Sequence, residues 1–297
     1  MNRTKSKDIE SSGLKTKVGP GLILIYVLLV IWALTTIYPI FWVVENSFKA
    51  KDKILANSFA LPMGELFTLA NYTRAFKNLN IFRAYGNSLF ISGCVTVIVM
   101  LLAGLASYAL VRFDFKGKEL INSLIIAAMM FPVFATIIPV FTMEMKWGIV
   151  NTNNWFLTML SVILPQVAGN LSFAIIVLSG YIQGLPLDLE EAAHLEGCSI
   201  PRIFFSVIVP LSKPSFVTVA VFSFLWSYND LFTQMFFLRR PEMRAITRLL
   251  NELTSQEGTN YGLMAAAVTL IVIPVIILYV FLQKYIIRGM TAGAIKG

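Results

Sequence analysis

The residues best suited to chemistry gather in one stretch, residues 184–214. It holds two adjacent carboxylates, Glu190 and Glu191, and the only histidine of the chain, His194. Carboxylates and imidazole can bind a metal, but a protein metal site normally needs several His, Cys or acidic ligands at short spacing. One His and two Cys, of which Cys94 falls inside an apolar run, are too few. We therefore expect no metal site and no catalytic site, and interpret the stretch as a charged surface for another protein.

Asp230 is the one acidic residue well inside an apolar run. A carboxylate within a membrane is costly, so it marks a functional site by default. The alternative is a structural aspartate near the end of a span, bonded to the backbone or to a partner subunit. We take Trp226, Asn229 and Asp230 as candidates for a translocation path. Gln166 and Asn170 lie near the middle of another apolar run, where amides usually face protein or water.

The composition identifies the environment of these residues. The chain has 297 residues, of which 57% are hydrophobic and 13% charged, whereas a soluble domain carries about 25% charged residues. It is therefore expected to be an integral membrane protein. The net charge of +8 is better explained by lipid head groups and topology signals than by nucleic acid. The sequence contains no phosphate-binding GxxxxGK[ST] loop, so ATP hydrolysis on this chain is not expected.

The hydropathy pattern predicts an all-α protein with six transmembrane helices, because six apolar runs are long enough to cross a bilayer. They cover residues 21–44, 86–111, 119–143, 155–182, 215–237 and 260–283. Residues 1–20 form a basic N-tail, and residues 284–297 form a small, flexible C-tail. The basic residues of the N-tail and of the turn 112–118 favour cytoplasmic termini. For Pro132 and Pro139 in the third run, a simple kink is preferred over a broken helix that lines a pathway.

Within residues 184–214 the pattern predicts two short helices outside the hydrocarbon. Asp188 is expected to cap the first helix, with Glu191 three residues later as in a capping box. Gly197 is a suitable stop. Pro201 can open the second helix, and Pro210 marks the return to the membrane.

The same stretch resembles the EAA loop of permease subunits of binding-protein-dependent ABC importers. The matching residues are Glu191-Ala192-Ala193, then Gly197, then Val207-Ile208-Val209-Pro210; Val at 207 and 209 replaces the usual Ile and Leu. The resemblance implies the type I ABC importer permease fold and a coupling helix that docks on an ATPase. In that role Glu191 supplies charge to the ATPase surface, Ala192 and Ala193 allow close approach, and Gly197 permits the turn. Pro210 completes the motif.

Four further segments resemble sugar-importing members of this family. Ser47-Phe48-Lys49 and Leu69-Ala70-Asn71-Tyr72 resemble the first external loop of sugar permeases. Trp226 to Asp230 resembles a Trp-Asn-Asp/Glu signature, with two inserted residues. The C-terminus resembles that of maltose-type second permease subunits, which reaches between the two ATPase subunits. The tail residues that carry this last match are Thr291, Ala292, Gly293, Lys296 and Gly297.

The resemblance implies a transporter subunit rather than an enzyme, in a bacterial or archaeal inner membrane, crossing it several times with both termini cytoplasmic. Its expected partners are two ATPase subunits that hold ATP and Mg, a second permease chain, an extracellular solute-binding protein and the lipid bilayer; no cofactor is expected on this chain. A sugar or oligosaccharide is the expected solute, with a peptide, amino acid or polyamine as alternatives. A secondary transporter would need more mid-membrane ionisable groups than Asp230 and related halves, and a membrane enzyme would need clustered His, Asp or Glu.

Overall fold

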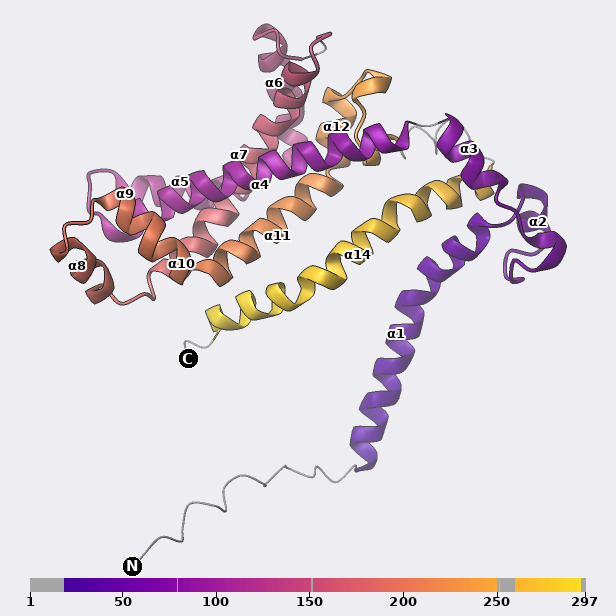
Figure 1. Cartoon of the computed structure of the whole chain (residues 1–297), viewed down its shortest axis with the longest axis horizontal. Coiled ribbons are helices and arrows are strands. Elements are labelled where there is room, and N and C mark those ends of the chain that lie inside the picture. The colour runs from indigo at the N-terminus through magenta and orange to yellow at the C-terminus, as the bar shows by residue number, and fades with distance from the viewer. Residues whose placement is uncertain (1–18, 79, 151, 250, 252–259, 295–297) are drawn as a thin grey trace, which may run out of the picture.

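The computed structural model describes residues 19–78, 80–150, 152–249, 251 and 260–294, and every regular element within them is a helix. Five long helices form its frame (Figure 1). They are α1 (Pro20–Ser47), α4 (Ile81–Arg112), α7 (Trp155–Ile182), α11 (Lys213–Asn229) and α14 (Tyr261–Ala294). The predicted all-α class is confirmed for the described part of the chain.

Shorter helices connect and flank these five. Before α4 lie α2 (Lys51–Ala56), η1 (Gly64–Leu66) and α3 (Ala70–Asn78). Between α4 and α11 lie α5 (Lys118–Ala128), α6 (Val133–Lys146), α8 (Asp188–Leu195), α9 (Ile200–Ile203), η2 (Phe204–Ile208) and α10 (Val209–Leu211). After α11 come α12 (Leu231–Phe237) and η3 (Pro241–Met243).

The core lies where α4 packs against α7 and α11. Small residues permit this close approach, because a membrane offers little hydrophobic drive for helix association and van der Waals packing must supply it. Ala103 and Ser107 of α4 and Ala174 of α7 are fully buried. At Gly104 an added Cβ would lie 2.9 Å from the Phe216 ring of α11. A larger residue at position 104 would therefore require the Phe216 ring to move.

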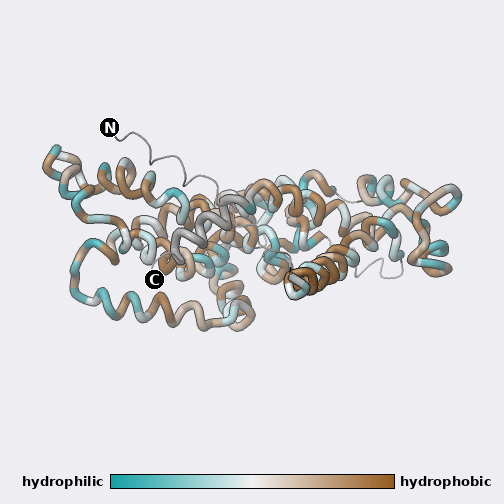
Figure 2. The backbone as a smooth tube through the Cα atoms, turned by 90° about the horizontal axis from the view of Figure 1, so that it is seen from below, coloured by the Kyte–Doolittle hydropathy of each residue, from teal (hydrophilic) through white to brown (hydrophobic). Residues whose placement is uncertain are grey.

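Four helices are long and apolar enough to cross a membrane: Pro20–Ser47, Ile81–Arg112, Trp155–Ile182 and Tyr261–Phe281. A fifth span results if the bent pair Ile200–Leu211 and Lys213–Asn229, which meet at 82°, is counted as one. Hydrophobic residues predominate along the long helices (Figure 2). The chain is thus a multi-pass membrane protein; among the described residues, four or five spans are shown by length and composition, and the full predicted set of six stays a prediction.

The predicted third span, residues 119–143, is broken rather than kinked. α5 ends at Ala128, and α6 begins at Val133 with Pro132 in extended conformation as its N-cap. Proline has no N–H to donate and disfavours helical backbone in the residue before it, which here is Phe131. The preference for a simple kink was wrong at Pro132. It holds at Pro139, which stays inside α6.

The two ends of the chain also differ from expectation. α14 is helical through Ala294, so the tail expected to be flexible continues a helix over most of its length. At the other end, none of the 18 residues in the most apolar part of α1 is buried against the described part of the chain. Toward its N-terminus, α1 diverges from α14 (Figure 1). The apolar side chains of α1 are therefore left for lipid or for another subunit.

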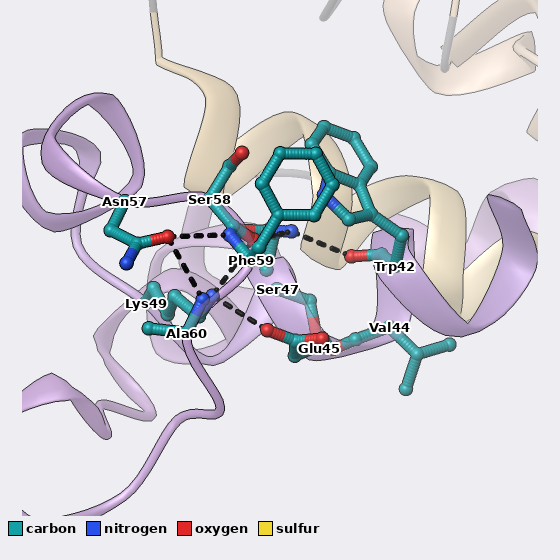
Figure 3. Close-up of polar contacts among 10 residues, drawn as sticks. Trp42, Val44, Glu45, Ser47, Lys49, Asn57, Ser58, Phe59 and Ala60 are labelled. Atoms are coloured by element: carbon teal, nitrogen blue, oxygen red, sulfur yellow. Dashed lines mark hydrogen bonds and ion pairs between the residues drawn. The ribbon is translucent and has the colours of Figure 1, made fainter. Parts of the chain in front are cut away.

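A buried polar cluster fixes the chain where α1 ends (Figure 3). Lys49 is 0% exposed, and its Nζ lies 2.7 Å from Glu45 Oε1 and 3.1 Å from the Ser58 carbonyl oxygen. The Asn71 amide of α3 donates to the carbonyl oxygens of Ser47 and Lys49. The Ser47 hydroxyl also lies 2.7 Å from the Tyr72 hydroxyl. The two loop segments singled out in the sequence thus meet at one place.

Candidate functional site

The predicted hairpin is present, and Gly197 ends its first helix. Gly197 has φ of +83°, a left-handed conformation that favours glycine. Its N–H donates to the His194 carbonyl oxygen at 2.9 Å, and the Cys198 N–H donates to that of Ala193 at 3.1 Å. These two bonds make a Schellman motif, which satisfies carbonyl groups at a helix C-terminus. The predicted helix stop is confirmed.

The start of α8 differs from the prediction. Asp188 is the first helical residue, Leu187 occupies the N-cap position, and no side chain there accepts a capping bond. The expected capping box of Asp188 and Glu191 is therefore wrong. Both carboxylates still lie in the first turn of α8, where the helix dipole favours negative charge.

The carboxylate of Glu190 turns inward and ties α8 to the end of α4. Glu190 Oε1 lies 2.6 Å from Arg112 Nε, and the Tyr108 hydroxyl donates to Glu190 Oε2 at 2.9 Å. Arg112 also donates to the Leu185 carbonyl oxygen at 3.0 Å. Sequence reasoning missed this anchor. The predicted topology put the basic turn 112–118 and the acidic pair on the same side of the membrane, but nothing in the sequence paired Arg112 with Glu190.

The opposite side of the hairpin is exposed. Glu191, Ala192 and Gly197 are solvent-exposed, and Ala193 is half-buried. Leu195 is 88% exposed, more than the exposed apolar residues near it, Leu189 at 45% and Ile200 at 50%. A charged residue, a small residue and an exposed leucine close together can form a contact surface for another protein. Leu195 was not singled out from the sequence, because helical periodicity does not reveal which apolar residue lacks an internal partner.

The second helix of the hairpin begins and ends at prolines. Pro201 lies in the first turn of α9, as expected. The helix continues through the π-turn η2 into α10, which contains Pro210. The bend of 82° into α11 follows at once. Pro210 therefore stands at the junction between hairpin and bundle, which agrees with its predicted position.

The C-terminal site residues are only partly described. Thr291, Ala292 and Gly293 belong to the backbone of α14. Lys296 and Gly297 lie outside the described residues. Their role at an ATPase interface stays a prediction.

Asp230 interrupts the predicted fifth span. α11 ends at Asn229, and Asp230 is the N-cap of α12, where its Oδ1 accepts from the Thr233 N–H at 3.0 Å. Its Oδ2 accepts from Gln166 Nε2 of α7 at 2.9 Å. The structural alternative for Asp230, a bond to the backbone, is thus observed. The same carboxylate also lines a pocket, which keeps the path interpretation open.

This pocket has a volume of about 330 Å³ and lies between α6, α7, α11 and α12. Trp226 and Asp230 line it together with Gln166, Gly169 and Asn170. Asn229 does not line it and is exposed, with its amide bonded to the Leu225 carbonyl oxygen. The structure therefore brings two of the three path candidates together with the two amides noted in the sequence.

Comparison with known proteins shows which family the chain resembles. Residues 100–292 match the family described as "Binding-protein-dependent transport system inner membrane component". The diacetylchitobiose uptake system permease protein NgcG of Streptomyces coelicolor is 31% identical over 91% of this chain and 88% of its own length. The galactooligosaccharides transport system permease protein GanQ of Bacillus subtilis is 32% identical over 93% of this chain and 96% of its own length.

The fold is also that of a solved transporter chain. A bacterial ABC transporter involved in the import of the acidic polysaccharide alginate has a chain with a TM-score of 0.76 and 24% identity, covering 89% of this chain and 95% of that one. The family match spans the core helices from the middle of α4 to the end of α14, and the two permeases align over nearly their whole length. The chain therefore belongs to the family of inner membrane components of binding-protein-dependent transport systems.

Proposed function

We propose that this chain is the membrane-spanning subunit of an ATP-driven importer for a sugar or oligosaccharide. The names of NgcG and GanQ, which align over about nine-tenths of the chain, refer to diacetylchitobiose and to galactooligosaccharides. As a member of a transport family, the chain moves its solute and leaves the chemistry of ATP to a separate subunit. The observation that carries the mechanism is the hairpin: an exposed face with Glu191 and Leu195, anchored through Glu190 to α4.

The proposed cycle is a rigid-body movement. ATP and Mg bind to two cytoplasmic ATPase subunits, which close on each other and pull the docked hairpin. Because Glu190 bonds to Arg112 and Tyr108, the pull reaches α4 directly and tilts the bundle between inward-facing and outward-facing states. An extracellular solute-binding protein delivers the sugar, and a second permease chain completes the path.

In this arrangement the chain crosses the membrane six times with both termini in the cytoplasm. The broken pair of α5 and α6 supplies the third span, and α11 with its continuation α12 supplies the fifth. The exposed apolar surface of α1 supports the first of these crossings, because no residue of its most apolar part is buried against the described part of the chain.

A photo-crosslinking amino acid at Leu195 tests the docking surface. Leu195 is 88% exposed, so the substitution should not disturb folding. In cells that express the chain with its genomic neighbours, we expect an adduct with a subunit that carries a phosphate-binding loop. The same probe at Phe82, which is 79% exposed at the opposite end of α4, is the control and should give no such adduct. Equal crosslinking from both positions, or solute uptake that continues without the ATPase, would contradict the proposal.

A further inference from the structure

We infer that the pocket beside Asp230 is a subsite for neutral saccharides on this chain, and that its carboxylate selects against acidic ones. The inference rests on the proposed function, since it names a place on the path and the class of sugar that this place accepts. Three observations carry it: an unpartnered buried acceptor, a fixed carboxylate with no cationic residue in the pocket lining, and a partly exposed tryptophan.

The unpartnered acceptor belongs to Asn170. Its side chain is 7% exposed, and its Nδ2 donates to the Gln166 carbonyl oxygen at 2.7 Å. Its Oδ1 is buried without a hydrogen-bond partner, and Asn170 is one of the residues that line the pocket. A buried polar atom left in this state is unfavourable unless a ligand or water satisfies it. A sugar hydroxyl is a suitable donor.

The carboxylate of Asp230 is held in place from two sides. Gln166 Nε2 donates to Oδ2, and the Thr233 N–H donates to Oδ1. Gln166 is itself fixed, because its Oε1 accepts from the Ser227 hydroxyl at 2.5 Å. Each carboxylate oxygen has further acceptor capacity, and hydrogen bonds from hydroxyls to a carboxylate are short and strong.

No cationic side chain is among the residues that line the pocket, and Asp230 is their one ionisable member. An acidic sugar would bring a second carboxylate next to Asp230 without a counter-ion, and like charges brought together in a poorly hydrated site repel strongly. A neutral sugar meets no such penalty. The pocket therefore discriminates by charge.

The apolar wall suits the faces of a sugar ring, which carry C–H groups while the hydroxyls project at the edges. The Trp226 ring is packed at 4.8 Å against Phe173 and at 5.6 Å against Phe222, yet the residue remains 45% exposed. Phe134 and Phe232 contribute further aromatic surface. A mostly apolar recess with a few placed polar groups is typical of small-molecule sites.

Gly169 gives a direct way to fill the pocket. It lines the pocket, and a Cβ built on it meets no heavy atom within 4 Å. Gly169→Leu should therefore fold and occupy the space. Gly180 is the matched control, since it lies on the same helix, also has nothing within 4 Å of an added Cβ, and is not among the pocket residues.

The test is saturation-transfer NMR on the purified transporter complex without the solute-binding protein, so that the specificity of that protein does not enter. The probes are diacetylchitobiose, galactotriose and maltotriose as neutral sugars and trimannuronate as an acidic one. We expect signals from at least one neutral sugar and none from trimannuronate. Gly169→Leu should reduce the neutral signal about tenfold or more, the scale of losing one charge-assisted hydrogen bond, and Gly180→Leu should leave it unchanged.

Asp230→Asn isolates the charge, because asparagine also caps helices well and α12 should stay intact. We expect weaker binding of the neutral sugar and a new signal from trimannuronate. Asp114→Asn, which removes a fully exposed carboxylate on the turn after α4, should alter neither.

The outcomes separate the subsite from the function. ATP-dependent uptake of a neutral sugar in cells, together with equal signals from the Gly169 and Gly180 variants, would overturn the subsite while the importer stands. Trimannuronate binding to the unmodified complex as strong as that of the neutral sugars would overturn the charge selection. No uptake and no binding of any neutral sugar would overturn both.

Discussion

Arg112, the last residue of α4, and Glu190 of α8 form an ion pair at 2.6 Å in which both side chains are about nine-tenths buried. The adjacent Glu191 is exposed. Of two neighbouring glutamates in one short helix, one is therefore bonded to the bundle and the other is exposed, where the proposed ATPase can reach it. Their substitutions should have different consequences.

Glu190→Ala should destabilise the chain, because it leaves the Arg112 guanidinium buried without its partner, a loss of about 3–5 kcal/mol in comparable sites. Glu191→Ala should change stability by less than about 0.5 kcal/mol, as exposed positions usually do, while weakening association with the ATPase. Thermal unfolding of the purified chain and co-purification of the ATPase measure the two effects. Equal loss of stability in both variants would refute the division of roles.

The left-handed turn at Gly197 makes a second prediction. Gly197→Ala should cost about 1–2 kcal/mol because a Cβ is unfavourable in this conformation, although the space around it is open. Gly197→Asn should cost less, since asparagine tolerates positive φ. We expect sugar uptake to follow the order glycine, asparagine, alanine. An alanine variant as active as the original chain would show that the turn does not limit coupling.

These two elements also show how far sequence reasoning reaches. The hairpin, its glycine stop and its exposed acidic face follow from local signals, because the Schellman turn needs only a glycine at the correct place. The Glu190–Arg112 pair joins residues 78 positions apart, and no local pattern distinguishes Glu190 from Glu191. Likewise, the sequence could single out the path candidates Trp226 and Asp230 individually. That they share a pocket with Gln166 depends on how α7 packs against α11, which no local pattern predicts.

The limits at Pro132 and Asp230 have a physical origin as well. Hydropathy records how apolar a segment is, and both residues lie in runs that were predicted to span the membrane, 119–143 and 215–237. Backbone breaks within such a segment depend on whether neighbouring groups can satisfy the freed N–H and C=O groups. At Asp230 the side chain itself does so, by accepting from the Thr233 N–H.

Close packing at Gly262 gives a third prediction. A Cβ there would lie 2.5 Å from the Lys49 carbonyl oxygen and 2.7 Å from Asn71 Nδ2. Gly262→Ala should therefore break the bond between Asn71 and Lys49 and destabilise the chain by about 1–3 kcal/mol. Gly86→Ala is the control, since its Cβ meets nothing and alanine favours the helix by about 0.5–1 kcal/mol. Limited proteolysis of residues 51–69 should accelerate in the first variant alone.

The buried pair of Glu45 and Lys49 gives a fourth. Lys49→Met should leave the Glu45 carboxylate buried without its partner and lower the free energy of unfolding by about 3–5 kcal/mol. Adding Glu45→Leu should restore much of this loss, because apolar replacement of a whole buried pair is often neutral. Chemical denaturation in detergent would measure both. If the double variant were no more stable than the single one, the pair would have to act through the Ser58 carbonyl contact instead.

The helix α4 is bonded at both of its ends. Arg112 and Tyr108 hold the hairpin at one end, while at the other Asn87 donates to the Arg244 carbonyl oxygen and Ser88 accepts from the Ile246 N–H. Its 32 residues contain no proline, whereas α1, α6, α7 and α14 each contain one in the helix interior. At 1.5 Å per residue it forms one continuous helix of about 48 Å. In the proposed cycle, a displacement of the hairpin would therefore be transmitted along α4 to residues 244–246 without loss at a kink.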